Sequence, residues 1–260
     1  MKRLASKYPV VFSLAVVGVL FIFTYIGRAM YPVVVVGDLT QLDPSAFEPP
    51  TQFERMLSTF QSAEGVFDIL AIVFAAALLT WLGWWREAGF TARCKNLPLA
   101  LPPLVIAAIA LSDGVRVPDG FGQIVALLVT TALAVFAEEI VFRGLMWRAL
   151  VHRGPILAAA LTAVLSGIVV YGINATGGPV PEARFITALT LCGSFAYAAI
   201  RWRCASIWPV IGVHFLVALA IAFANLGSST YQFLLYAGTI GFIIYGLFLL
   251  RTARVRADGG

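Results

Sequence analysis

The chain has 260 residues, of which 60% are apolar and only 12% are charged. A soluble globular domain usually carries about 25% charged residues, so the composition excludes an ordinary soluble enzyme or binding domain. The formal net charge of +5 does not indicate a nucleic-acid partner, because lysines and arginines beside anionic lipid headgroups account for such an excess. The sequence therefore predicts a multi-pass membrane protein.

Apolar segments along the chain predict the transmembrane helices. A run of about 18 or more apolar residues is long enough to cross a bilayer, and several segments meet or approach that length. The third and sixth segments are short, and Pro98, Pro102 and Pro103 crowd the start of the third, so that helix is expected to begin late or to kink. We expect an all-α fold with about eight transmembrane helices in a single membrane domain over residues 1–260. In chain order the segments are 10–29, 66–85, 98–112, 122–150, 155–173, 185–200, 205–225 and 231–250.

The basic residues predict the orientation of the chain. If both termini are cytoplasmic, most of the 18 lysines and arginines fall on the cytoplasmic side, as the positive-inside rule requires. The outer side then holds only Arg28, Arg55, Arg116 and Arg184. The first segment is longer than the apolar region of a signal peptide, and no cleavage site follows it, so we interpret it as an uncleaved anchor in the cell membrane.

One long polar segment, 31–65, is predicted on the outer side. Within it, Phe53, Met56, Leu57 and Phe60 recur at the spacing of one helical face. This pattern predicts a short helix lying on the membrane surface. A lid over a site that opens outward is the alternative interpretation.

The adjacent Glu138 and Glu139 are the acidic residues that we place inside a membrane helix. An ionisable residue at the bilayer centre costs roughly 2.5–3.5 kcal/mol on insertion scales, so such a pair indicates a functional site. Arg143 follows Glu139 at i+4, where an ion pair within the helix is possible. Glu138 is then left without an obvious local partner. A purely structural ion-pair cluster that locks helices together is the alternative.

His214 is the other candidate inside the membrane. Counting from the helix ends at 1.5 Å per residue places the glutamates about 21 Å from the outer end and His214 about 13 Å from the cytoplasmic end. In a hydrocarbon core roughly 30 Å thick these depths are similar. We therefore expect His214 to converge on the glutamates from a different helix.

Glu138 to Gly144 resembles the first motif, EExxxR with FRG, of the CPBP intramembrane proteases, the family of CAAX prenyl endopeptidases and of bacterial bacteriocin-processing or immunity proteins. Ser206 to His214 resembles the approach to the third motif, HxxxN or HxxxD, and the resemblance covers about 120–225. In that family the first Glu is taken as the base that activates water. The resemblance implies that Glu138 is this base, that Glu139 and Arg143 support it, and that His214 is the third-motif histidine.

Two positions depart from the family pattern. The second-motif histidine should fall near 170–174, where Tyr171 and Asn174 could supply only a hydrogen bond, and the third-motif Asn is replaced by Ala218. Catalytic zinc usually takes three protein ligands rich in histidine. With only one suitable histidine a zinc enzyme is not expected, and the cofactor stays open.

The resemblance implies an intramembrane endopeptidase that cleaves a membrane-associated or lipidated peptide with a glutamate-activated water. Its expected partners are membrane lipids and a peptide or protein substrate. The alternative is a catalytically inactive relative that binds peptides as an immunity or chaperone-like protein. A small secondary transporter is a third interpretation, against which the chain has no repeated halves of the kind many such carriers show.

Overall fold

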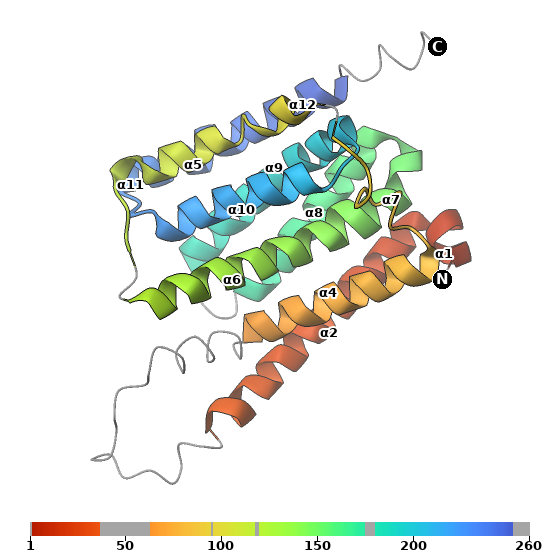
Figure 1. Cartoon of the computed structure of the whole chain (residues 1–260), viewed down its shortest axis with the longest axis horizontal. Helices are drawn as coiled ribbons and strands as arrows, with labels where there is room; N and C mark the ends of the chain where they lie inside the picture. Colours follow the sequence, from red (N-terminus) through yellow and green to blue (C-terminus); the bar gives the residue numbers. More distant parts are fainter. Residues whose placement is uncertain (1, 37–62, 95, 118–119, 175–179, 252–260) are drawn as a thin grey trace.

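The computed structural model describes residues 2–36, 63–94, 96–117, 120–174 and 180–251, and these residues form a bundle of helices (Figure 1). Within these ranges the β-structure is a single isolated bridge between Val115 and Ala224. An apolar chain in a bilayer must satisfy its backbone hydrogen bonds internally, and helices do so within one segment. The predicted all-α membrane class is confirmed.

The α-helices are α1 (Lys2–Lys7), α2 (Pro9–Val36), α4 (Ala63–Leu82), α5 (Leu104–Ala110), α6 (Phe121–Glu138), α7 (Trp147–Leu150), α8 (Pro155–Asn174), α9 (Val180–Cys204), α10 (Trp208–Phe223), α11 (Ser228–Phe233) and α12 (Thr239–Arg251). Short 3₁₀-helices are η2 (Leu97–Ala100), η3 (Leu111–Asp113) and η5 (Val151–Arg153), and π-helices are η4 (Glu139–Met146) and η6 (Leu234–Gly238).

Six of the described helices are long and apolar enough to cross a membrane, and the helices over Leu97–Asp113 and Trp208–Phe223 are shorter. Each of the eight predicted segments therefore coincides with helix, but the number of crossings and the orientation of the termini stay predictions. The sixth segment is longer than expected, because α9 continues past Arg201 and Arg203 to Cys204 and has 25 residues. In the third segment Pro102 and Pro103 separate η2 from α5, as predicted.

The surface helix predicted within segment 31–65 is not tested by the structure. Phe53, Met56, Leu57 and Phe60 lie outside the described residues. That prediction and the alternative of a lid both stay open.

Small residues allow the central helices to approach closely. Helix α9 packs along α8 and along α12. A Cβ atom on Gly167 of α8 would lie 3.2 Å from the Leu191 side chain, and one on Gly246 of α12 would lie 2.6 Å from Phe195. Lipid tails are as apolar as leucine, so close van der Waals packing of this kind holds membrane helices together.

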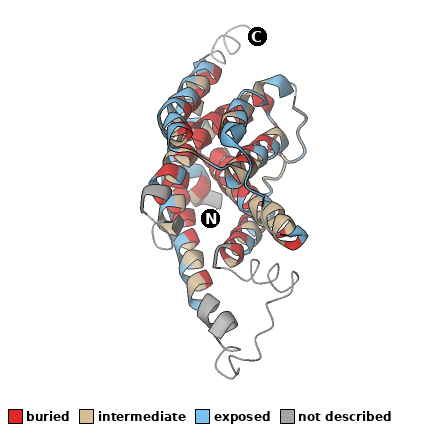
Figure 2. Ribbon diagram, turned by 90° about the vertical axis from the view of Figure 1, so that its left-hand side faces the viewer, coloured by how far each residue is buried: buried red, intermediate tan, exposed pale blue. Residues whose placement is uncertain are grey.

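Large apolar side chains cover much of the outside of the bundle. Val73, Ile240 and Ile244 are each more than half exposed, and Figure 2 shows exposed residues along the outward faces of the helices with buried residues between them. In water such a surface would drive aggregation. In a bilayer it faces lipid tails without penalty.

All six tryptophans lie at one end of the bundle. They occur at the end of α4 and just after it, at the start of α7, near the end of α9 and at the start of α10. Helix α1 and the last residues of α12 lie at the same end of the bundle (Figure 1). Trp residues gather where the membrane meets water. This belt therefore marks the level of the lipid headgroups: Trp81, Trp84, Trp85, Trp147, Trp202 and Trp208.

Replacing Gly246 by valine is expected to destabilise the protein by about 1–3 kcal/mol, because the new side chain overpacks the contact between α12 and α9. Gly241→Val on the same helix is the matched control, since a Cβ atom there meets nothing within 4 Å. Thermal unfolding in detergent would compare the two variants. Equal stabilities would contradict the close packing of α9 and α12.

Candidate active site

Glu138, Glu139, Arg143 and His214 come together inside the bundle. The two glutamates lie where α6 ends and η4 begins, and Arg143 lies within η4. His214, on α10, has its Nδ1 2.8 Å from Glu139 Oε1 and its Nε2 3.9 Å from Glu138 Oε2. The convergence expected from helix depth alone is therefore found in the structure.

The π-helix η4 gives Arg143 two partners where the sequence predicted one. Its Nη1 atom lies 3.3 Å from Glu138 Oε1 and 3.3 Å from Glu139 Oε1. A π-helix has a wider turn that closes i→i+5 hydrogen bonds, and it often occurs at functional sites. The wider turn lets a side chain five residues after Glu138 reach that carboxylate. The expectation that Glu138 lacks a local partner was wrong for this reason.

Two serines from other helices complete the anchoring of Glu138. Ser166 on α8 donates a hydrogen bond of 2.5 Å to Glu138 Oε1. Ser194 on α9 lies 3.4 Å from the same oxygen and 3.1 Å from Ser166 Oγ. The hydrogen bonds that the described residues make to this carboxylate all end on Oε1. Oε2 is the oxygen on the side of His214.

Neither serine was identified from the sequence. A hydroxyl in an apolar helix commonly bonds a backbone carbonyl of its own helix, as Thr162 does with Ala158. Sequence alone does not distinguish that use from a bond to another helix. Only the packing of α8 and α9 against η4 brings Ser166 and Ser194 to Glu138.

His214 is held on two sides. Glu139 Oε1 accepts from its Nδ1, and the ring of Tyr197 stacks on the imidazole with centroids 4.7 Å apart at 29°. The guanidinium carbon of Arg143 lies 5.8 Å from the centre of the same Tyr197 ring. An ionised carboxylate only accepts hydrogen bonds, so Glu139 fixes which nitrogen of the imidazole is turned toward Glu138. Tyr197 was not identified from the sequence, where it is one aromatic residue among many.

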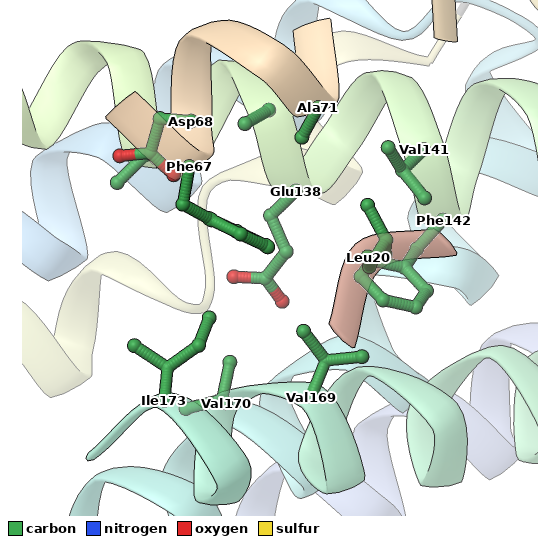
Figure 3. Close-up of a pocket in the computed structure, with 12 residues that line it drawn as sticks. Leu20, Phe67, Asp68, Ala71, Glu138, Val141, Phe142, Val169, Val170 and Ile173 are labelled. Carbon is green, nitrogen blue, oxygen red and sulfur yellow. The ribbon is translucent and has the colours of Figure 1, made fainter. Parts of the chain in front are cut away.

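The cluster lies between two cavities. Glu138 lines a cavity of about 240 Å³ enclosed by α2, α4, α6 with η4, and α8, and Figure 3 shows its carboxylate among mostly apolar side chains. His214 and Tyr197 line a second cavity of about 280 Å³ between α5, α9, α10 and α12. The two groups that could act on a substrate therefore face different apolar spaces.

Asp68 is a further acidic residue in the cavity of Glu138 (Figure 3). It lies in the Gly65–Leu82 span and is 9% exposed. The expectation that only Glu138 and Glu139 are acidic within a membrane helix was therefore wrong. The sequence did contain the signal, because Asp68 falls inside the apolar segment 66–85, close to its start.

Comparison with known proteins adds a family to this geometry. Residues 120–220 match the family model described as type II CAAX prenyl endopeptidase Rce1-like, and the matched segment contains all four clustered residues. The resemblance to the CPBP intramembrane proteases is confirmed. At the level of the family, the match supports a CAAX-type intramembrane protease, and it covers residues 120–220. No curated protein and no solved structure matched the chain.

The second-motif histidine of the CPBP proteases is expected on α8. There, the helix face toward Glu138 carries apolar side chains. Val169, Val170 and Ile173 line that cavity, about one and two turns after Ser166. Tyr171 is 43% exposed and does not line it. The structure therefore gives no support to Tyr171 as a substitute for the histidine. Asn174 ends α8, and its side chain lies outside the described residues.

The third-motif position is also apolar. Ala218 lies one turn after His214 and lines the same cavity. A methyl group offers no hydrogen bond to an oxyanion. The site therefore lacks the amide that the family pattern would place beside His214.

The donor set does not fit a catalytic zinc ion, which some views of the CPBP family include. The described residues contain no group of three or more His, Cys, Asp or Glu side chains arranged to hold a metal. Within the cluster, His214 Nδ1 is directed at Glu139, and the Arg143 cation lies 3.3 Å from each carboxylate. A second cation would meet the repulsion of this guanidinium, so no catalytic step is assigned to a metal.

Arg143→Gln is expected to destabilise the protein by about 3–5 kcal/mol, because it leaves two buried carboxylates without their shared cation. Adding Glu138→Gln to that variant should recover part of the loss, since one uncompensated charge is removed. Thermal unfolding in detergent would measure both, with exposed Arg153→Gln as the control. An Arg143→Gln protein as stable as the Arg153→Gln protein would contradict a compensating role for Arg143.

Proposed function

We propose that this chain is an intramembrane endopeptidase in which Glu138 activates the attacking water. The observation that carries the proposal is the asymmetry of the Glu138 carboxylate. Arg143, Ser166 and Ser194 all hold Oε1, while Oε2 is on the side of His214, 3.9 Å from Nε2. A general base needs one fixed orientation and one oxygen free to take a proton.

The distance between Oε2 and Nε2 suits a water molecule between them. At 3.9 Å the two atoms are too far apart for a direct hydrogen bond. One water oxygen can lie within hydrogen-bonding distance of both atoms, and water can bridge polar groups that are more than about 3.5 Å apart. Such a water would be oriented by the base on one side and by the imidazole on the other.

The proposed reaction balances without any cofactor. Glu138 Oε2 takes one proton from water as the water oxygen bonds to the carbonyl carbon of the scissile peptide. The tetrahedral intermediate then collapses, the C–N bond breaks, and the proton held by Glu138 passes to the leaving nitrogen. His214 Nε2, turned toward this point by Glu139, can donate a hydrogen bond to the oxyanion of the intermediate when the imidazole is protonated on both nitrogens. The products are a peptide carboxylate and a peptide amine.

The substrate class follows from the surroundings of the cluster. Both cavities are lined mainly by apolar side chains from the apolar helices of the bundle. A substrate with an apolar segment or a lipid chain would be retained there, whereas a fully polar peptide would lose its hydration without compensation. We propose a membrane-associated or lipid-modified peptide.

A second candidate function has an observation of its own. Val170 and Ala218 occupy the regions where the family pattern has a histidine and an asparagine. Losing one oxyanion donor typically costs about 10²–10³ in rate. The same cavities could then bind a peptide without cleaving it, in an immunity or chaperone-like protein.

Glu138→Gln is expected to reduce cleavage at least about 100-fold, because general-base catalysis contributes on the order of 10²–10⁴. The measurement uses purified protein in nanodiscs with a panel of lipidated and unlipidated peptides, and exposed Glu87→Gln is the control. Adding a metal chelator to the same assay should leave the cleavage activity unchanged. Failure of the folded protein to cleave any peptide, while a relative with intact motifs cleaves the same panel, would overturn the catalytic proposal.

If no peptide is cleaved, variants that fill the Glu138 cavity test whether the protein binds peptides without cleaving them. A non-catalytic peptide binder should tolerate Glu138→Gln but lose binding when Ala71 or Ala134, both in the lining of the Glu138 cavity, is replaced by phenylalanine.

Ser166→Ala is expected to lower kcat about tenfold or more with little change in KM, because it releases an anchor of the base without touching substrate. Thr162→Ala is the matched control, since Thr162 is also buried on α8 but bonds the carbonyl oxygens of Ala158 and Ala159 in its own helix. Steady-state cleavage kinetics would compare the two. Equal effects on kcat would show that Ser166 acts only through the stability of α8.

A further inference from the structure

A second concave site lies at the tryptophan-rich end of the bundle, away from the glutamates. It is a pocket of about 470 Å³ between the chain that follows α4, helix α7 with η5, and the end of α9. It shares no lining residue with the two cavities of the catalytic cluster. Its lining consists of Arg86, Glu87, Thr91, Ala92, Trp147, Arg148, Val151, Arg201, Trp202 and Ala205.

The pocket carries an excess of positive charge. Three arginines and one glutamate line it. None of the three arginines forms a salt bridge with a described carboxylate, because the described ion pairs all belong to the catalytic cluster. Arg201 Nη2 donates to the backbone oxygen of Glu87 at 3.0 Å, and the Glu87 side chain is exposed to its surroundings. The three arginines therefore have no ion-pair partner among the described carboxylates, although the guanidinium carbon of Arg148 lies 5.3 Å from the centre of the Trp84 ring.

The arginines also have unused hydrogen-bonding capacity. Arg201 is only 5% exposed, and its Nε is buried without a hydrogen-bond partner. The Nε of Arg148 is buried and unpartnered in the same way. A buried polar group without a partner costs free energy, and native structures rarely leave one unpaired. Two guanidinium groups that each keep an unpartnered Nε beside one pocket are consistent with an acceptor-rich anion there.

The depth of the pocket indicates the source of that anion. Trp147 and Trp202 line it with ring centroids 6.2 Å apart, and both belong to the belt of six tryptophans. Such belts lie at the level of the lipid headgroups. Trp202 is 40% exposed, and apolar side chains cover the outside of the neighbouring helices. A bound headgroup could therefore keep its acyl chains against the bundle.

We propose that this pocket binds the headgroup of an anionic phospholipid, with the phosphate oxygens accepting hydrogen bonds from Arg86, Arg148 and Arg201. Guanidinium groups match phosphate oxygens in a bidentate arrangement, which ammonium groups do not. Basic pockets between transmembrane helices are sites of this chemistry. A bound lipid would also tie the loop after α4 to α9, because Arg86 and Arg201 lie on these two segments.

The test is native mass spectrometry of the full-length protein in detergent, titrated with phosphatidylglycerol or phosphatidylcholine. The unchanged protein should retain phosphatidylglycerol in preference to phosphatidylcholine. Arg86→Gln/Arg148→Gln should weaken phosphatidylglycerol binding on the order of tenfold, from the loss of two charges at the headgroup. Arg201 is left intact in this variant, because its guanidinium supports the loop at Glu87 and packs against Gly89.

The matched control is Arg93→Gln/Arg153→Gln. Both residues are exposed, neither lines the pocket, and the variant loses the same charge from the same end of the bundle. It should bind phosphatidylglycerol nearly as well as the unchanged protein. Equal losses in the two variants would overturn the site, because they would reflect general surface charge. If the first variant does not fold, Arg86→Gln against Arg93→Gln gives the same comparison with two exposed residues.

Competition with a soluble anion distinguishes a lipid headgroup from free phosphate as the occupant of the pocket. Inorganic phosphate at millimolar concentration should not displace the bound phosphatidylglycerol, because it lacks the acyl chains that contact the bundle. Displacement by phosphate, or equal retention of phosphatidylcholine, would overturn a lipid as the natural occupant.

Discussion

The site depends on one buried cation, the guanidinium of Arg143 between Glu138 and Glu139. Without it, two neighbouring carboxylates would lie in an apolar interior at a cost that a membrane helix rarely tolerates. Residues 139–146 form a π-helix, and its wider turn helps to place position 143 near position 138 as well as 139. The π-helical backbone and the sharing of Arg143 by the two glutamates are therefore linked. An ordinary α-helix through the same residues would favour the Glu139 pair and leave Glu138 free.

Close helix packing fixes the orientation of the side chains in this charge cluster. Glycines at the contacts of α9 with α8 and with α12 bring these helices near one another, and the same packing places Ser166 and Ser194 beside Glu138 Oε1. Tyr197, also on α9, stacks on His214. Helix α9 thus contributes no charged group to the cluster but fixes the orientation of both the base and the imidazole. A structural ion-pair cluster alone would not require one carboxylate oxygen to be held and the other to lie on the side of His214.

The bundle separates two kinds of polar chemistry by depth. Deep in the apolar region, charge is compensated internally among Glu138, Glu139, Arg143 and His214. At the tryptophan belt, Arg86, Arg148 and Arg201 are not compensated by described carboxylates. The first arrangement suits a reaction on a peptide that must be drawn away from water. The second suits an anion supplied by the membrane itself, and it is consistent with the positive charge of the whole chain.

The sequence by itself determined the helical membrane class, the helical segments and the candidates Glu138, Glu139, Arg143 and His214. Apolar run length and the cost of buried charge are local properties that residues report without a structure. Depth along two helices even indicated that His214 meets the glutamates. Only the tertiary structure decided the second partner of Arg143, the serines on Oε1, the stacking of Tyr197 and the cavity that Asp68 shares with Glu138. These features depend on which faces of distant helices meet, and a hydroxyl or an aromatic ring in an apolar helix gives no sign of that choice.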